Sequence, residues 1–213
     1  MGLSINVLGI GHNTPVFMDL ALDCGYEIAG LFHYNNDRTG ESDHGYRIDG
    51  SFEDLLAQDL SGKRFLLTMG DNKVRTELSS KIMERGGLVP TLVHPTAVIS
   101  RFATLSDIGV YVSAFSFVQA DTSIGSNTII LSGVNISHTN KVGSSCFFAG
   151  GATLGAYTEV GDFVFMGQGA LSISGKVKHI GHHSYIGARA LLTYDVPANA
   201  VVAGSPARVI KIV

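Results

Sequence analysis

The sequence predicts two parts of different fold class, an α/β part over residues 1–90 and a parallel β-helix over residues 91–213. Three observations support this prediction. Short apolar runs alternate with helix-like stretches in the first part, which is typical of a parallel sheet covered by helices. An apolar residue recurs every six positions in the second part. The 26 glycines and the lack of tryptophan suit a chain with many tight turns.

The first part is expected to alternate strands and helices in chain order. The apolar runs INVLGI, YEIAGLF and RFLLTM predict three strands. TPVFMDLALDCG predicts a helix with Pro15 near its start and Gly25 as its end. A second helix is expected after Ser51, and a third runs through NKVRTELSSKIMER to Gly86. This order predicts a small Rossmann-like domain.

The second part keeps a strict period of six. The apolar positions are Val112, Val118, Ile124, Ile130, Ile136, Val142, Phe148, Leu154, Val160 and Met166. One residue is inserted near Ile108 and two in ISGKVKH, after which the period resumes at Ile180. A helix cannot keep one apolar face at this period, whereas a β-helix with 18-residue coils stacked at about 4.8 Å can. Small residues such as Gly125 and Gly143 follow the apolar positions and are expected to ease each bend.

Charge and cysteine content narrow the partners and the compartment. The formal net charge of −3 gives no electrostatic reason to expect nucleic acid or an anionic membrane as a partner. No run reaches the roughly 18 apolar residues of a membrane helix, and no signal peptide is expected. The two cysteines, Cys24 and Cys146, lie in different parts, so we expect thiols and a cytoplasmic location.

A small polar cleft is expected where the strands of the first part end. Gly9 and Gly11 lie between a strand and a helix, where backbone N–H groups can meet an anion. A dinucleotide fingerprint requires a third glycine at position 14, which is Thr14, so NAD is not expected. An alternative is a degenerate domain that only packs on the β-helix. The residues expected at the cleft are Gly9, Gly11, His12, His33, Tyr34, Gly70, Asp71, Asn72 and Lys73.

The chain resembles the hexapeptide-repeat sugar acetyltransferases. The resemblance rests on the six-residue frame, on TLVHPTAVIS at 91–100 and on VVAGSPARVIK at 201–211. With VLGIGHNTPVFMDLALDCGYEIAGLF and TMGDNKVR, it extends to the bacterial nucleotide-sugar N-acetyltransferases, such as UDP-N-acetylbacillosamine N-acetyltransferase, and the sialic acid O-acetyltransferases. It implies a left-handed β-helix, a homotrimer, acetyl-CoA bound between neighbouring β-helices, and an N-terminal domain that binds the nucleotide-sugar.

The same resemblance assigns candidate catalytic and cofactor residues. NISHTNKVG matches the segment that holds the family's catalytic base, so it implies that His138 is the general base. The acid that usually follows is replaced by Thr139, a possible orienter of the imidazole. Asp121, one 18-residue coil earlier, is a second candidate for the missing charge. Alternatively, His138 and Asp121 are ordinary solvated turn residues. Alignment to the family places acetyl-CoA near Phe147, Gly151, Gln168, Gly169 and Ala188.

Several functions stay open at this stage. The first is acetyl-CoA-dependent N-acetylation of a nucleotide-linked amino sugar, a 4-amino-4,6-dideoxy hexose being favoured. The second is O-acetylation of a sugar hydroxyl, and the third is a silent trimeric binding scaffold. Phe147 replaces a histidine of some members, and His33 and Tyr34 replace an acidic pair. No metal is expected, because His182 and His183 in KHIGHHS share one turn and their side chains diverge.

Overall fold

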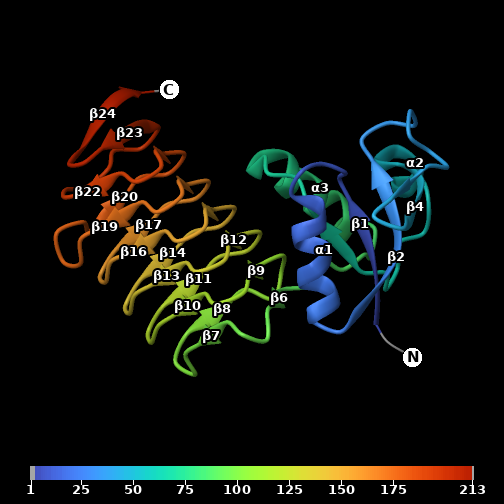
Figure 1. Ribbon diagram of the computed structural model, residues 1–213, viewed down its shortest axis with the longest axis horizontal. Helices are drawn as coiled ribbons and strands as arrows, with labels where there is room; N and C mark the ends of the chain where they lie inside the picture. The colour runs from blue at the N-terminus through green and yellow to red at the C-terminus, as the bar shows by residue number, and fades with distance from the viewer. Residues whose placement is uncertain (1–2, 213) are drawn as a thin grey trace. The chain divides into compact units, whose positions relative to one another are not determined.

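The computed structural model describes residues 3–212 and divides after Leu92 into two compact units (Figure 1). The first unit has an α/β fold with a mostly parallel sheet, and the second is a left-handed parallel β-helix. Each unit encloses its own apolar core. The predicted fold classes are therefore confirmed.

The first unit has one five-stranded sheet in the order β3-β4-β2-β1-β5. Its strands are β1 (Leu3–Leu8), β2 (Tyr26–His33), β3 (Ser42–Asp43), β4 (Tyr46–Ser51) and β5 (Phe65–Leu67). Its helices are α1 (Thr14–Asp23), α2 (Phe52–Leu56) and α3 (Asn72–Glu84). Neighbouring strands run parallel except for β3, which pairs antiparallel with β4.

The sequence did not predict β4, which lies between the second and third expected strands. Its residues, YRIDGS, include one large apolar side chain that is buried, Ile48, so no apolar run marks the strand. Pairing with β2 stabilises it, with Ile48 opposite Leu31. The carboxyl end of β4 leads directly into α2 at Phe52. This missed strand therefore positions one wall of the cavity described below.

The helix ends follow local capping. Ser51 Oγ accepts a hydrogen bond from Asp54 N–H at 3.1 Å, and the Asp54 carboxylate accepts one from Ser51 N–H at 3.0 Å. This capping box begins α2. Asp71 caps α3 by accepting from Lys73 N–H at 2.8 Å. Gly25, at a φ of 82°, follows the end of α1, where residues with side chains are disfavoured.

The second unit stacks its short strands in three sheets, which form the three sides of the β-helix (Figure 1). The eight-stranded side contains β6 (Leu92–Val93), β9 (Tyr111–Val112), β12 (Ile129–Ile130), β15 (Phe147–Phe148), β18 (Phe165–Met166), β21 (Tyr185–Ile186), β23 (Ala200–Gly204) and β24 (Ala207–Ile212). The six-stranded side contains β7 (Val98–Ile99), β10 (Phe117–Val118), β13 (Asn135–Ile136), β16 (Thr153–Leu154), β19 (Leu171–Ser172) and β22 (Leu191–Leu192). The five-stranded side contains β8 (Thr104–Leu105), β11 (Ser123–Ile124), β14 (Lys141–Val142), β17 (Glu159–Val160) and β20 (His179–Ile180).

The period of six is confirmed, because each predicted apolar residue is the second residue of its strand and is buried. The bend itself lies three positions later, where the backbone takes a positive φ, as at Thr139 (58°) and Tyr157 (65°). The prediction that the small residues ease each bend was wrong. A Cβ on Gly143 would lie 2.8 Å from the backbone nitrogen of Asp162 on the next coil. These glycines therefore permit close stacking of coils.

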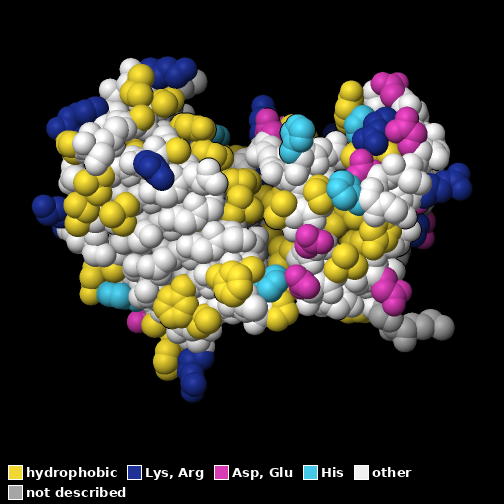
Figure 2. Space-filling view, viewed as in Figure 1, with side chains coloured by type: hydrophobic (Ala, Val, Ile, Leu, Met, Phe, Trp, Pro, Cys, Tyr) yellow, Lys and Arg dark blue, Asp and Glu magenta, His cyan; other side chains and the backbone are white. Residues whose placement is uncertain are grey.

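Apolar side chains are exposed near the first coils of the β-helix, as Figure 2 shows on the visible face. Among the exposed residues of this region are Val98, Phe102, Phe115 and Phe117. Cys24 and Cys146 are both present as thiols. Within residues 3–212, no helix has the length and apolar character needed to cross a membrane.

Candidate functional site

His138 lies at the corner that joins the six-stranded side to the five-stranded side, two residues after the end of β13. Its side chain is half-buried. Its Nδ1 atom is 3.0 Å from Thr139 Oγ1. The Tyr157 ring meets the imidazole edge to face, with 5.0 Å between the ring centroids and 89° between the planes. The imidazole is thus held between a hydroxyl and an aromatic ring.

The Thr139 contact bears directly on base catalysis. If Nδ1–H donates to Thr139 Oγ1, then Nε2 keeps its lone pair and can accept a proton. If the hydroxyl donates to Nδ1 instead, then Nε2 carries the proton and cannot act as a base. A carboxylate only accepts hydrogen bonds and would enforce the first arrangement. The Thr139 hydroxyl permits both.

Asp121 has the predicted register at this corner. Asp121 N–H donates to Phe102 C=O at 3.1 Å, and Thr139 N–H donates to Ala120 C=O at 2.9 Å, one coil further on. The Asp121 side chain is exposed. No hydrogen bond or ion pair joins its carboxylate to His138 or Thr139, all three of which lie within the described residues. The carboxylate therefore does not contact the imidazole directly.

A cavity of about 340 Å³ opens beside this corner on the five-stranded side. It is lined by Thr139, Lys141, Tyr157, Thr158, Glu159, Lys178 and His179. Asp195 supports its wall, because its Oδ1 accepts hydrogen bonds from Lys178 N–H at 2.6 Å and His179 N–H at 3.0 Å. Burial raises the pKa of Asp195, but these two bonds and the charges of His179 and Lys178 together leave the pKa below its usual value. Sequence reasoning missed this cavity.

The predicted cofactor residues gather on and beside the eight-stranded side. Phe147 stacks on Phe165 of the next coil, with 5.3 Å between ring centroids. Gly151 and Gly169 take φ values of 69° and 62° at the corner between the eight- and six-stranded sides. Gln168 and Ala188 belong to successive coils at that same corner. This corner differs from the His138 corner, so within one chain the two groups are separated by a side of the β-helix.

The first unit contains a cavity of about 350 Å³ at the carboxyl ends of β1 and β5. Five predicted residues line it: Gly9, Gly11, His12, Tyr34 and Gly70. Sequence reasoning missed Ile10, Asn13, Phe52, Thr68, Met69 and Val74, which line it as well. Phe52 follows the unpredicted strand β4, and Thr68 directly follows β5, where a polar residue at the end of an apolar strand was a usable signal.

The other four predicted cleft residues lie outside this lining. His33 is buried, and its Nδ1 is 2.8 Å from Asn35 Oδ1. Asp71 is the N-cap of α3. Asn72 Oδ1 accepts a hydrogen bond from the Arg75 guanidinium at 2.7 Å. Lys73 is exposed. His33, Asp71 and Asn72 thus make local contacts within the neighbouring loop and helix.

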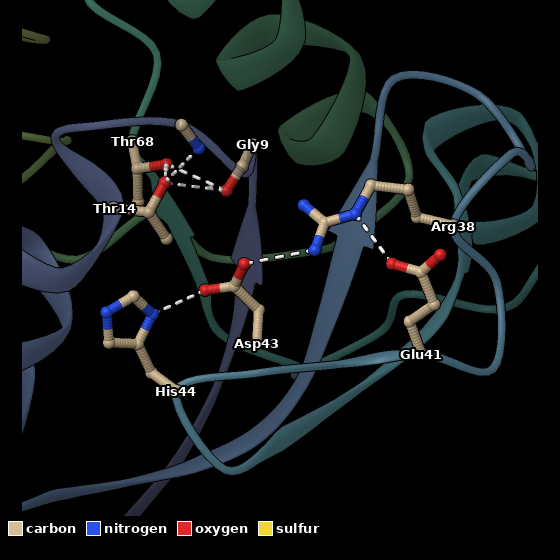
Figure 3. Close-up of polar contacts among 8 residues, drawn as sticks. Gly9, Thr14, Arg38, Glu41, Asp43, His44 and Thr68 are labelled. Carbon is tan, nitrogen blue, oxygen red and sulfur yellow. Dashed lines mark hydrogen bonds and ion pairs between the residues drawn. The ribbon is translucent and has the colours of Figure 1, made fainter.

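The glycine-rich loop of this cavity is closed by threonine side chains (Figure 3). Thr14 Oγ1 and Thr68 Oγ1 are 3.0 Å apart, and the Thr68 hydroxyl is 2.9 Å from Gly9 C=O. Gly11 N–H donates to Thr14 Oγ1 at 2.9 Å. Gly9 has a φ of 96°, which favours glycine, whereas a Cβ on Gly11 would meet no atom within 4 Å. Gly11 therefore leaves room for a ligand.

A chain of ion pairs fixes the loop that follows Tyr34 (Figure 3). The Arg38 guanidinium lies 2.9 Å from Glu41 and 3.2 Å from Asp43, and His44 bonds the second oxygen of Asp43. The hydrogen bond from His44, together with Arg38, lowers the pKa of Asp43 against the opposing effect of burial. Within residues 3–212, no group of three or more His, Cys, Asp or Glu side chains forms a metal site.

Known proteins resemble both units together. No protein-family model matches the chain. GDP-perosamine N-acetyltransferase of Escherichia coli O157:H7 is 28% identical over 192 residues, covering 89% of this chain and 86% of that protein. Crystal structures of perosamine N-acetyltransferase from Caulobacter crescentus with CoA and GDP-perosamine align with a TM-score of 0.87 and 28% identity, covering 98% of this chain and 97% of that one. The resemblance to the hexapeptide-repeat sugar acetyltransferases is confirmed.

Two further likenesses differ in how much of each protein they cover. The acetyltransferase domain of PglB from Neisseria gonorrhoeae, in complex with acetyl coenzyme A, aligns with a TM-score of 0.88 and 25% identity over 99% of this chain and 100% of that one. The acyl-[acyl-carrier-protein]–UDP-N-acetylglucosamine O-acyltransferase of Pseudomonas putida is 29% identical over 89 residues, which is 42% of this chain. The chain spans only about a third (34%) of the length of this relative.

Proposed function

We propose that the chain is an acetyl-CoA-dependent N-acetyltransferase that acts on the amino group of a nucleotide-linked amino sugar. The observation that carries this proposal is the likeness over nearly the whole chain to an enzyme bound to CoA and GDP-perosamine. It includes both units, so it is more informative about substrate than a match to the β-helix alone. The favoured substrate is a nucleotide-linked 4-amino-4,6-dideoxy hexose.

His138 is the proposed general base. With Nδ1–H donated to Thr139 Oγ1, Nε2 accepts a proton from the sugar amine as its nitrogen bonds to the thioester carbonyl carbon. The carbonyl oxygen carries negative charge in the tetrahedral intermediate, and backbone N–H groups of a neighbouring turn are suited to stabilise it. The C–S bond then breaks, and the released CoA thiolate takes up a proton. The products are an amide and free CoA.

The nucleotide-linked sugar is proposed to bind in the cavity of the first unit. This cavity of about 350 Å³ combines the open backbone at Gly11 with the side chains of Tyr34 and Phe52. Aromatic side chains suit a nucleobase, and exposed backbone suits its phosphates. In this proposal residues 1–90 bind the nucleotide-sugar and residues 91–213 carry out acetyl transfer.

A homotrimer is the proposed assembly. Within one chain, the corner with His138 is separated by the six-stranded side from the corner with Gly151 and Gly169. A neighbouring copy that presents its glycine-lined corner to His138 would bring acetyl-CoA and base together. The two cysteine thiols suit a reducing compartment, and we propose the cytoplasm.

A thiol-release assay tests the function. The protein, acetyl-CoA and a panel of nucleotide-linked sugars would be mixed, each amino sugar being matched to a counterpart with hydroxyl in place of amine. We expect CoA release with the amino sugars and a product that has gained one acetyl group on nitrogen. Release with the hydroxyl sugars alone would indicate an O-acetyltransferase, and no release with any member of the panel would favour a binding scaffold.

A further inference from the structure

The regular hydrogen bonding of the β-helix is interrupted next to His138. At this corner, N–H groups normally donate to the coil before: Asp121 to Phe102 at 3.1 Å, Thr139 to Ala120 at 2.9 Å, and Gly175 to Ala156 at 3.2 Å. The corresponding bond from Tyr157 N–H to His138 C=O is missing, although both residues lie in the described range. The series of backbone hydrogen bonds at this corner is thus broken between the coils of His138 and Tyr157 and resumes between those of Ala156 and Gly175.

The other two corners show that this break is local. The matching bonds are present there, including Ser145 to Ser126 at 2.7 Å, Phe163 to Ser144 at 3.0 Å and Arg189 to Gln168 at 2.8 Å. Among the described residues of these corners only Phe115 differs, and its N–H donates to the Thr96 hydroxyl instead. The Tyr157 corner therefore departs from regular stacking next to the proposed base.

Tyr157 has a bulky side chain in a backbone conformation that favours glycine, a feature that it shares with Phe115 and Phe163. Its φ is 65°, in the left-handed region that bulky side chains disfavour, and 58% of its surface is exposed. Neither burial nor backbone preference explains a large aromatic residue at this place. Strain of this kind is frequently found at functional sites.

We propose that Tyr157 is a positioning residue for His138 and takes over the orienting task that an acid performs in the resembling family. Its ring lies against the imidazole at 5.0 Å and 89°, while Thr139 contacts Nδ1. Within residues 3–212, these are the hydrogen-bonding and ring contacts of the imidazole. Edge-to-face pairs have a defined geometry, so the Tyr157 ring restricts the rotation of the His138 ring that Thr139 alone leaves open.

This proposal rests on the proposed role of His138 as base. It predicts that the ring of Tyr157 matters and its hydroxyl does not. Losing an edge-to-face contact corresponds to a change of roughly 3- to 10-fold. We therefore expect Tyr157→Leu to lower kcat by roughly 3- to 10-fold with both KM values unchanged, and Tyr157→Phe to keep the wild-type kcat.

The β-helix supplies a matched control in Phe163. This residue is also aromatic and in the left-handed conformation, with a φ of 58°, and it stacks on His183 at 4.9 Å away from the proposed site. Phe163→Leu should leave kcat unchanged. Tyr157→Asn, which suits the left-handed conformation, gives a second variant without the ring should Tyr157→Leu fail to fold.

The outcomes separate the positioning role from the proposed function. Wild-type kcat in a folded Tyr157→Leu or Tyr157→Asn variant would overturn the proposal. A rise in KM with kcat unchanged would also overturn it, because it would make Tyr157 a wall of the substrate cavity. Equal losses in Tyr157→Phe and Tyr157→Leu would assign the effect to the hydroxyl. His138→Asn is measured alongside: if it keeps full activity, the base assignment itself is wrong, whereas an inactive His138→Asn with an unaffected Tyr157→Leu refutes positioning alone.

Discussion

Replacing Thr139 with aspartate tests the proposed tautomer and the backbone strain at once. Thr139 has a φ of 58° and is the one β-branched residue among the non-glycine residues of residues 3–212 with positive φ. Its Oγ1 lies 3.0 Å from His138 Nδ1. Aspartate tolerates the left-handed conformation and accepts hydrogen bonds without donating them. Thr139→Asp should therefore hold the imidazole with Nδ1 protonated and Nε2 ready to accept a proton.

Two magnitudes follow from the position of this residue. Thr139 is exposed, so the interaction of a carboxylate with the imidazolium about 4 Å away is near the solvent-screened value of about 1 kcal/mol. That energy moves the acidic limb of the kcat/KM–pH profile to higher pH by about 0.7 unit, because the charged imidazole is stabilised and only the neutral one accepts a proton. Relief of the strained backbone is worth about 1 kcal/mol, or a rise in Tm of about 2–4 °C.

Thr139→Asn is the matched control. It provides the same backbone relief without the charge, so both variants should gain in Tm while only Thr139→Asp moves the acidic limb. Thiol release measured from pH 5 to 9 and thermal unfolding supply the two readouts. Equal pH profiles in the two variants would refute the claim that residue 139 faces the imidazole. An unchanged Tm in both would show that the left-handed corner costs threonine little.

Three further predictions follow. His138→Ala should lower kcat by about 10²–10⁴-fold in the thiol-release assay while the protein stays folded. Gly11→Val should weaken nucleotide-sugar binding in calorimetry with little change in Tm, since its Cβ enters open space, whereas Gly9→Val, at a φ of 96°, should lower Tm. Hydrogen bonds from the backbone and side chain of Ser51 lower the pKa of Asp54. The ionised Asp54 carboxylate therefore stabilises the fold above about pH 4, and this stabilisation is lost as pH falls. Asp54→Ala should therefore lower Tm at neutral pH and make its decline in acid shallower.

The fold could be predicted largely because both units display simple periods. Residues from Val112 to Met166 occupy the core at every sixth position, and a repeat of this kind permits few architectures. The strand β4 escaped prediction because pairing with β2 and one large buried apolar side chain, Ile48, stabilise it, and neither leaves an apolar run in the sequence. Tertiary pairing outweighed local propensity there.

The candidate site was less predictable than the fold. Family resemblance pointed to His138 and Thr139, and the structure brings their side chains to 3.0 Å. The contact of Tyr157 with His138 was not predicted, since sequence spacing cannot reveal where a ring turns or which backbone hydrogen bond is lost. Asp121 has the predicted register but does not contact the imidazole. Register follows from the coil length, whereas contact depends on side-chain rotamers.

A repeat makes its own exceptions informative. Most corners of this β-helix repeat one hydrogen bond and one backbone conformation, so stability alone gives no reason for a corner to differ. Two departures occur next to each other: a β-branched residue in the left-handed conformation at Thr139, and a lost bond between His138 and Tyr157. Each departure makes this corner less regular than the others, and neither buries an apolar side chain. Both departures lie beside one half-buried histidine, His138, and function explains this placement better than folding does.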